Sequence, residues 1–466
     1  MGRINRWPIR RAFNSGHWAS ARRQAFSLLD NIKESEFAQD IIIRSYWNEK
    51  RWHDVISFST RWPKAKHHNY SARALEKLNP KSKPKIISFE DGPIGLLPKW
   101  DVNSPLSMWA QSDNRIWFRT PYGCVHFDFP EGYDLNSTNP ALIELATEIL
   151  LFPWQRKLRN CGNSTREPGE NLALSFSCGI DSTAAMLTMP EDTILAYHRR
   201  DFDSMIDHSN ADKLISHIEE RLKREVIQVR SDHEKIRSHE ELYAGFSSPY
   251  AVGVHLILLA DHLNLKGIAF GTPIDNSWLN KGNKYRNFTN SNHWKQWKIR
   301  FQRAGLDLLL PISMISEAGA LRICKNSELI DNLNSCLRGN NGQGCGECWK
   351  CFHKNGPLGR RMDPHSKEIS VFLATRPLKT AMQALWALQK MNLEYLVPDL
   401  AHLLEQDLEW WEKYYSPGFD LLPEYLKKHV RDRIVEELEP MALPYQLEDV
   451  DIFPIEKKDV IVPNNE

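Results

Sequence analysis

The residues between Leu172 and Leu187 have the types and spacing that could bind a nucleotide. Leu172-Ala-Leu-Ser-Phe176 predicts a strand, Thr183-Ala-Ala-Met-Leu187 predicts the start of a helix, and the short loop Ser177-Cys-Gly-Ile-Asp-Ser182 joins them. The N–H groups of such a loop, and of the helix N-terminus that follows, point at a bound phosphate. Asp181 would be repelled by phosphate, so we expect it to bind Mg²⁺ beside a phosphate chain.

Four of the eight cysteines form a second group with chemical meaning. Cys336, Cys345, Cys348 and Cys351 contain two tight Cys-x2-Cys-like steps within one short segment. Four thiolates at this spacing suit a closed, tetrahedral Zn²⁺ site, and an iron–sulfur cluster is the alternative. Because the protein would fill all four positions, we expect the metal to be structural and not catalytic.

Cationic residues follow two of the predicted strands. His198-Arg-Arg200 comes directly after one strand, and Lys281, Lys284 and Arg286 come after the turn that begins at Gly271. Cations at these places could stabilise the charge that develops on ATP. Arg199 and Lys281 are therefore candidates for catalysis.

The turn from Gly271 to Asp275 also follows a predicted strand. Gly271 and Asp275 are candidates for contacts with the nucleotide, and Asp275 could bind Mg²⁺ or ribose, or simply cap the turn. For Glu317 and Arg322, near a predicted helix, we expect a surface or capping role.

These residues are positioned by strands that alternate with helices from residue 171 onward. The alternation predicts an α/β fold with a doubly wound parallel sheet, helices on both faces, and ligands bound beyond the carboxyl ends of the strands. The strands are expected within the apolar runs at 172–176, 193–197, 225–229, 267–270 and 306–311.

The rest of the chain divides by composition. We expect a basic helical region with a weak repeat, a β-rich region followed by a helix, the nucleotide-binding domain, the cysteine knuckle, a second helical region and an acidic tail or arm. Their expected limits are 1–80, 85–150, 171–335, 336–356, 365–437 and 440–466.

Composition sets the class of protein. The chain has 466 residues, of which 41% are hydrophobic, and a net charge of +1. A packed core is therefore expected. With no long apolar run and no apolar N-terminal segment, we expect neither a membrane span nor a signal peptide, and hence a cytoplasmic protein.

The loop at 177–182 resembles the PP-loop, Ser-Gly-Gly-x-Asp-Ser, of the AMP-forming ATP pyrophosphatases. Ser177, Gly179, Asp181 and Ser182 match that motif, whereas Cys178 replaces its first glycine. A side chain at this place is easily tolerated only where φ is negative. The resemblance implies that these five residues surround the pyrophosphate part of ATP and its Mg²⁺.

Together, the loop and the four cysteines resemble 7-cyano-7-deazaguanine synthase and its relatives, over residues 171–356. The resemblance implies a Zn²⁺ site at the cysteines and an enzyme that uses ATP to activate a carboxylate as an acyl adenylate before a nucleophile attacks. The acceptor would be a small molecule or a protein. The long extensions at both ends indicate a diverged relative.

Three other functions remain open. An ATP-dependent epimerase that acts on a muramoyl-dipeptide carboxylate is a looser resemblance without a motif of its own. An RNA-modifying PP-loop enzyme would hold nucleic acid with its basic residues 1–83. A non-catalytic nucleotide-bound scaffold would bind proteins through its helical ends, although Asp181 argues against it.

Overall fold

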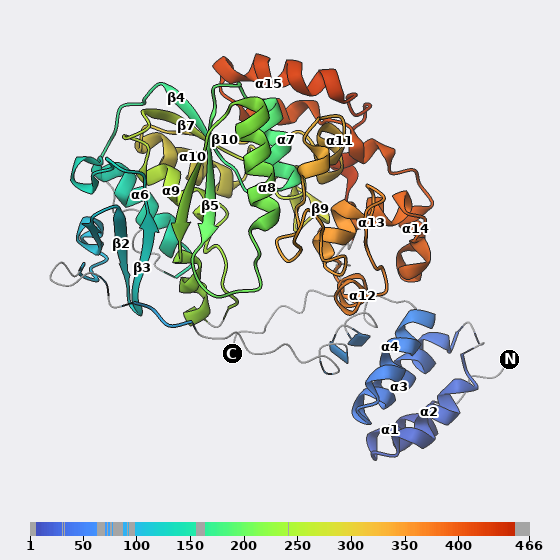
Figure 1. The fold of residues 1–466 in the computed structure, drawn as a ribbon. Coiled ribbons are helices and arrows are strands. Elements are labelled where there is room, and N and C mark those ends of the chain that lie inside the picture. Colours follow the sequence, from blue (N-terminus) through green and yellow to red (C-terminus); the bar gives the residue numbers. More distant parts are fainter. Residues whose placement is uncertain are drawn as a thin grey trace.

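The computed structural model describes residues 6–452 except 30, 32, 63–69, 72, 75–76, 78–86, 91, 93–97, 155–163 and 241. Its centre is an eight-stranded sheet with the order β1-β2-β3-β6-β5-β4-β7-β10 (Figure 1). The strands are β1 (Trp109–Ser112), β2 (Arg115–Thr120), β3 (Gly123–Asp128), β4 (Asn171–Ser175), β5 (Ile194–Arg200), β6 (Val226–Ser231), β7 (Leu265–Phe270) and β10 (Asp307–Leu309). A separate hairpin joins β8 (Leu279–Asn280) to β9 (Lys284–Tyr285).

Five neighbouring strands, β6-β5-β4-β7-β10, run parallel. Their apolar runs are buried on both faces: Ala173 and Leu174 of β4, for example, are fully buried. Numbered along the chain, these strands stand in the order 3-2-1-4-5, the order of doubly wound sheets that bind nucleotides between the first and fourth strands. In this protein that place is the edge of the sheet between β4 and β7.

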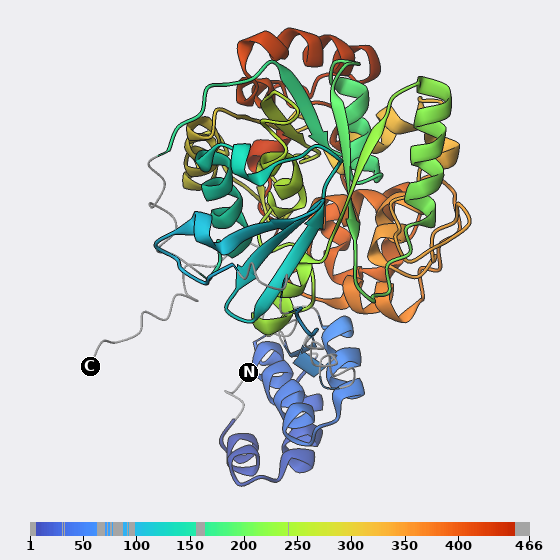
Figure 2. The same cartoon turned by 60° about the vertical axis from the view of Figure 1, so that its left-hand side comes forward.

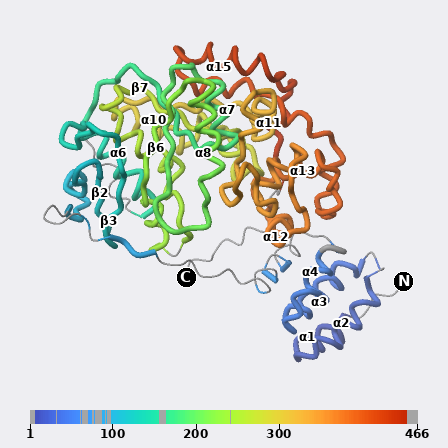
Figure 3. Tube along the Cα trace, in the orientation of Figure 1, coloured from blue at the N-terminus to red at the C-terminus, as the bar shows by residue number. Residues whose placement is uncertain are grey.

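Helices cover both faces of the sheet. In Figures 1 and 2, α7 (Ile180–Thr188) and α8 (Ser209–His217) lie on one face, and α6 (Pro140–Leu151), α9 (Val254–Leu258) and α10 (Asn292–Arg303) lie on the other. Helix α11 (Glu317–Lys325) packs against α7, although it is far away in sequence (Figure 3). The predicted α/β class is therefore confirmed, together with a sheet that is mostly parallel.

The β-rich region extends the same sheet. Strands β1, β2 and β3 are antiparallel to one another, and β3 pairs with β6 through Phe127↔Ser231 and Asp128↔Arg230. At the start of the β-rich region, residues 85–86 lie outside the described part, and an isolated bridge joins Glu90 to Cys124.

The expected helices at the two ends are present where the structure describes them. Helices α1 (Trp7–Asn14), α2 (Trp18–Phe26), α3 (Ser35–Asn48) and α4 (Trp52–Arg61) pack around a hydrophobic core of their own. The C-terminal region contains α12 (Lys367–Ala374), α13 (Ala381–Lys390), α14 (Ala401–Leu404) and α15 (Glu424–Glu437). In the described part of the chain, no helix combines the length and apolar character needed to cross a bilayer.

The start of the acidic tail is an arm that packs on the body. Leu447 is fully buried, and the N–H group of Tyr285 donates to the carbonyl oxygen of Val450 at 2.8 Å. The remainder of the predicted tail, residues 453–466, lies outside the described residues.

Candidate functional site

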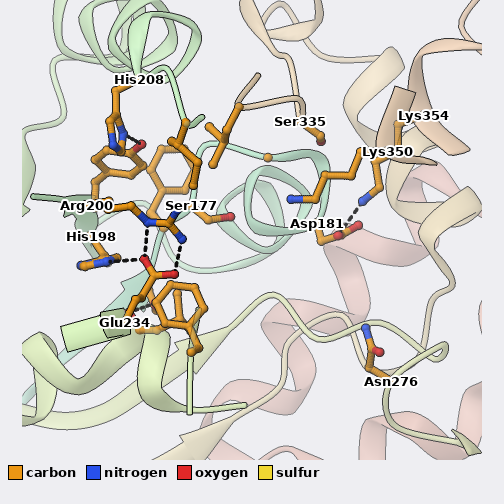
Figure 4. A pocket seen from close by; sticks show the side chains of 18 of the residues that line it. Ser177, Asp181, His198, Arg200, His208, Glu234, Asn276, Ser335, Lys350 and Lys354 are labelled. Carbon is orange, nitrogen blue, oxygen red and sulfur yellow. Dashed lines mark hydrogen bonds and ion pairs between the residues drawn. The ribbon is translucent and has the colours of Figure 1, made fainter. Parts of the chain in front are cut away.

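A cavity of about 480 Å³ opens at the carboxyl ends of β4 and β5, beside the loop at residues 177–182. This is the edge of the sheet at which the strand order predicts a ligand. Figure 4 shows two groups of polar side chains in it: Asp181, Lys350 and Lys354 on one side, and His198, Arg200 and Glu234 on the other. The volume is within the range of small-molecule sites.

The loop is shaped by one serine hydroxyl. The N–H groups of Ser177 and Gly179 donate to Oγ of Ser182 at 3.1 and 3.2 Å. Helix α7 then begins at Ile180, whose N–H group donates to Oγ of Ser335 at 2.9 Å. Ser177 and Gly179 line the cavity, so the start of α7 faces it.

Cys178 corrects one expectation from the sequence. Its φ is +58°, in the left-handed region, and not negative. Cys178 is only 2% exposed, packs into the core, and is not among the residues that line the cavity. Cys178 therefore has the backbone conformation that glycine adopts easily. Burial of its thiol offsets the resulting backbone strain.

The turn after β7 lies directly against the loop. A Cβ atom on Gly271 would come within 2.9 Å of backbone atoms of Asp181 and Ser182, so this position has room only for glycine. Four residues later, Asp275 is fully buried, and its Oδ2 accepts the N–H group of Glu317 at 2.9 Å. The structure thus brings Gly271 and Asp275 to the loop, as predicted, with Asp275 behind the cavity wall.

Two carboxylates share one amine behind the loop, and a third carboxylate, that of Asp275, contacts the backbone of Glu317. Nζ of Lys354 lies 2.6 Å from Oδ2 of Asp181 and 3.3 Å from Oε2 of Glu317. Within the described structure, Oδ1 of Asp181 and Oδ1 of Asp275 are buried and have no hydrogen-bond partner. The group contains more carboxylate charge than its lysine can balance.

The pKa values follow this imbalance. Desolvation raises the pKa of Asp181, although Lys354 opposes the shift, and burial together with Glu317 raises the pKa of Asp275 well above its usual range. Burial disfavours the charged form of Lys354, but Asp181 and Glu317 outweigh it and raise the pKa of this amine. An additional cation would be favourable at this place.

Lys350 and Lys354 belong to the segment that contains the four cysteines, residues 335–355, which we call the cysteine segment. The sequence analysis missed both lysines. Lys350 stands between Cys348 and Cys351, and Lys354 belongs to the helical turn Cys351–Asn355. Burial and the nearby charge of Lys354 lower the pKa of Lys350. The sequence contained a signal for both, since Lys350 lies within the four-cysteine motif and Lys354 follows it by three residues.

Glu317 also differs from its expected surface or capping role. It is the first residue of α11, is 5% exposed, and lines the cavity. The capping role belongs instead to Ser316, whose Oγ accepts the N–H group of Gly319 at 3.0 Å.

The four cysteines converge to form a candidate metal centre. The Sγ distances are 3.5 Å for Cys336–Cys345, 3.7 Å for Cys336–Cys348, 3.9 Å for Cys345–Cys351 and 3.6 Å for Cys348–Cys351. A Zn–S bond of ~2.3 Å in a tetrahedron places sulfur atoms ~3.8 Å apart. A cluster of several irons and sulfides would hold the thiolates farther apart, so the spacing fits a single ion.

Backbone N–H groups support these sulfurs. Cys345 donates to Sγ of Cys336, Gly346 donates to Sγ of Cys351, and Cys351 donates to Sγ of Cys348, each at 3.4 Å. These N–H···S contacts stabilise thiolate charge and orient the ligands. The predicted metal-binding cysteines are thus confirmed as a cluster that could bind a metal ion such as zinc.

The opposite side of the cavity contains a buried ion network. Nε2 of His198 lies 3.2 Å from Oε1 of Glu234, and the guanidinium of Arg200 contacts both oxygens of the same carboxylate. Burial would raise the pKa of Glu234, but hydrogen bonds from His198 and Arg200 lower it to about 2. This wall is therefore polar but already internally paired.

Arg199 and Lys281 lie elsewhere. The guanidinium of Arg199 binds Asp212 of α8, because alternate residues of β5 face opposite sides of the sheet. Lys281 lies in the β8–β9 turn, where its carbonyl oxygen accepts the N–H group of Thr380. Neither side chain is among those that line the described cavity.

Part of the chain matches a protein-family model. Residues 296–445 match a family of unknown function, DUF6395, over about a third of the chain. The matched segment contains Glu317, Lys350, Lys354 and the four cysteines, whereas the loop at 177–182 precedes it. No curated protein matches the chain.

Proposed function

We propose that this protein is a PP-loop ATP pyrophosphatase that uses ATP and Mg²⁺ to adenylate a carboxylate, or a similar carbonyl oxygen, for attack by a nucleophile. One observation carries the proposal: a Ser-x-Gly-x-Asp-Ser loop and the two lysines of the cysteine segment face the same cavity, at the carboxyl ends of the parallel strands β4 and β5. A small-molecule or protein carboxylate would be the substrate.

The phosphates of ATP would lie between the start of α7 and the lysines. Ser177 and Gly179 line the cavity on one side, and Lys350 and Lys354 line it on the other. Lysines act as point charges on phosphate oxygens, and a helix N-terminus adds a partial positive charge. This arrangement would favour pyrophosphate as a leaving group because it stabilises the charge that develops on it.

The residues at the loop fit Mg²⁺. Asp181 and Glu317 each place a carboxylate at the cavity, and Oδ1 of Asp181 and Oε2 of Glu317 are buried without hydrogen bonds from described residues. Mg²⁺ typically binds one or two carboxylates together with substrate phosphates. Asp181 would hold the ion through Oδ1, while its Oδ2 would remain paired with Lys354, and Oε2 of Glu317 would lie between the ion and Lys354.

The metal of the cysteine cluster would be Zn²⁺ with a structural role. All four ligands come from the protein, which leaves no position for a substrate. Its function would be to hold Ser335, Lys350 and Lys354 against the loop, because all three lie next to cysteine ligands in the sequence.

The test is transfer of oxygen from substrate to AMP. The intact protein is incubated with MgATP and a set of ¹⁸O-labelled carboxylic acids, and AMP, pyrophosphate and the label in AMP are measured. Adenylation requires that a carboxylate oxygen attacks the α-phosphorus, so one ¹⁸O atom appears in each AMP formed. Formation of ADP and phosphate, or of unlabelled AMP, contradicts the proposal.

A binding measurement makes the test independent of the acceptor. Affinity for an α,β-methylene analogue of ATP should fall more than about tenfold in Lys350→Met, because a charge-assisted hydrogen bond is worth roughly 1.5–3 kcal/mol. Lys295→Met is the matched control, since Lys295 is exposed on α10, and it should bind like the wild type. Equal affinity in all three proteins contradicts the phosphate site.

A further inference from the structure

A second group of ligand-type side chains surrounds His126, outside the cavity. His126 belongs to β3, Asp201 follows β5, and Asp232 follows β6, so three neighbouring strands of the sheet contribute. Glu90 joins the group through the bridge between its backbone and that of Cys124. His126 is 2% exposed and Asp232 is fully buried.

One nitrogen of His126 points at two carboxylates without bonding to either. Nδ1 lies 3.3 Å from Oδ1 of Asp232 and 3.8 Å from Oε1 of Glu90. It is buried and has no hydrogen-bond partner among the described residues. If Nδ1 is protonated, its N–H group would be directed at one of these oxygens. If Nδ1 is unprotonated, its lone pair and the two carboxylate oxygens could together coordinate a cation.

The other nitrogen has the partner that metal-bound histidines typically have. Nε2 lies 3.0 Å from Oδ2 of Asp201, and the other oxygen of Asp201 accepts a hydrogen bond from Arg230 at 2.6 Å. A carboxylate on the distal nitrogen fixes the tautomer, so that the nitrogen facing the metal keeps its lone pair. Asp201 would therefore orient the ligand without touching the metal.

Asp232 offers a single oxygen. Its Oδ2 is held by Nζ of Lys235 at 2.8 Å, while Oδ1 accepts the backbone N–H group of His126 at 2.7 Å and also faces Nδ1 of that residue. Ligand atoms ~2.0–2.2 Å from one ion lie about 3.0–3.5 Å apart. The separations of 3.3 and 3.8 Å at Nδ1 would need only a small inward movement of Glu90, whose side chain is 48% exposed.

We propose that Nδ1 of His126, Oδ1 of Asp232 and the carboxylate of Glu90 bind a second divalent transition-metal ion, of the zinc or manganese class, with Asp201 as the positioning residue. One nitrogen and two oxygens suit these ions better than Ca²⁺ or Mg²⁺. The ion would tie the antiparallel edge of the sheet to the carboxyl end of β6. Glu234, two residues beyond Asp232, lines the cavity, so the ion would brace that wall.

The test is metal stoichiometry. Intact protein is dialysed to equilibrium against Zn²⁺, and bound zinc is counted by mass spectrometry. We expect about two ions per wild-type chain, one at the four cysteines and one at His126, and about one in His126→Ala. Asp201→Asn should keep the second ion but bind it about 10–100-fold more weakly.

Controls separate metal loss from misfolding. His365→Ala removes an exposed histidine and should keep both ions. Glu90→Gln changes a half-exposed side chain, so the protein should fold and bind the second ion more weakly. If wild type and His126→Ala bind the same amount of Zn²⁺, and of Mn²⁺ in a parallel dialysis, His126 is an imidazolium in an ion-pair network and the proposal is overturned.

Discussion

Lys354 is the residue on which the electrostatics of the site depend. It neutralises Asp181 and Glu317 together, and it is itself 6% exposed. A buried carboxylate that loses its cation becomes an uncompensated charge, which destabilises a fold by about 3–5 kcal/mol.

We therefore expect Lys354→Met to lower the free energy of unfolding by about 3 kcal/mol. The double variant Asp181→Asn/Lys354→Met should lose less than the sum of the two single variants, because the second change removes a charge that the first left unpaired. Urea denaturation of the four proteins measures the coupling. Strict additivity would contradict the shared ion pair.

Cys178 makes a prediction about strain. Its left-handed backbone lowers the free energy of unfolding by about 1 kcal/mol relative to glycine. Packing of its buried thiol raises the free energy of unfolding by a similar amount. Cys178→Gly should therefore leave the free energy of unfolding within about 1 kcal/mol of wild type and preserve nucleotide binding. A loss of binding in a stable variant would show that the thiol itself contributes to the site.

Glu234 makes the free energy of unfolding depend on pH. Its pKa falls from 4.5 to about 2 in the folded state, so the stabilisation is present above pH 4.5 and is lost as the pH falls toward 2. The shift corresponds to about 3 kcal/mol at neutral pH. The difference in unfolding free energy between wild type and Glu234→Gln should shrink between about pH 5 and pH 3. A difference independent of pH would exclude the ion pair as its source.

At the scale of elements, the sequence predicted what local patterns encode. The strand, loop and helix at 171–188 and the four cysteines are short contiguous signals. The structure has all of them, with α7 beginning at Ile180, three residues before the expected start of the helix. The pairing of β3 with β6, which brings the β-rich region into the main sheet, depends on contacts that no local pattern contains. Glu317 and the lysines were missed for the same reason, since they meet Asp181 only through the packing of α11 and the cysteine segment.

The cysteine segment and the loop at residues 177–182 are joined by hydrogen bonds and an ion pair. Ser335 bonds to the first residue of α7, and Lys354 bonds to the second, so both ends of the segment contact the loop. A metal ion bound at the four cysteines would therefore fix the position of the lysines.

We expect removal of the metal to abolish nucleotide binding. Structural zinc can contribute on the order of 10 kcal/mol to local folding. Treatment with a chelator should release the metal, expose the segment to proteolysis and weaken binding of the ATP analogue more than about tenfold. Added Zn²⁺ should restore both properties. Unchanged affinity in metal-free protein would show that the lysines are held by packing alone.

At the scale of the whole molecule, the N-terminal helices are energetically separate. Their core contains residues such as Ile42 and Val55 and shares no member with the main core. After the helices, Ile87 donates its N–H group to Ser238, and its carbonyl oxygen contacts His239.

Deletion of residues 1–86 should therefore leave the body intact. Affinity for the ATP analogue should change by less than about twofold, since distant sites are usually independent. Isothermal calorimetry on the shortened and full-length chains measures the difference. A shortened chain that does not fold, or that loses the site, would show that the N-terminal helices support the body.

The strand order determines when the site can form during synthesis. Strand β4 lies between β5 and β7, and its loop finds its cation only at Lys354, 173 residues after Asp181. A ribosome that has just completed the loop has therefore produced an acidic, unpaired segment, whereas the N-terminal helices can already be folded. Asp181 can meet this cation only after residue 354, about three quarters of the way along the chain, has emerged, so the proposed nucleotide site would be completed late in synthesis.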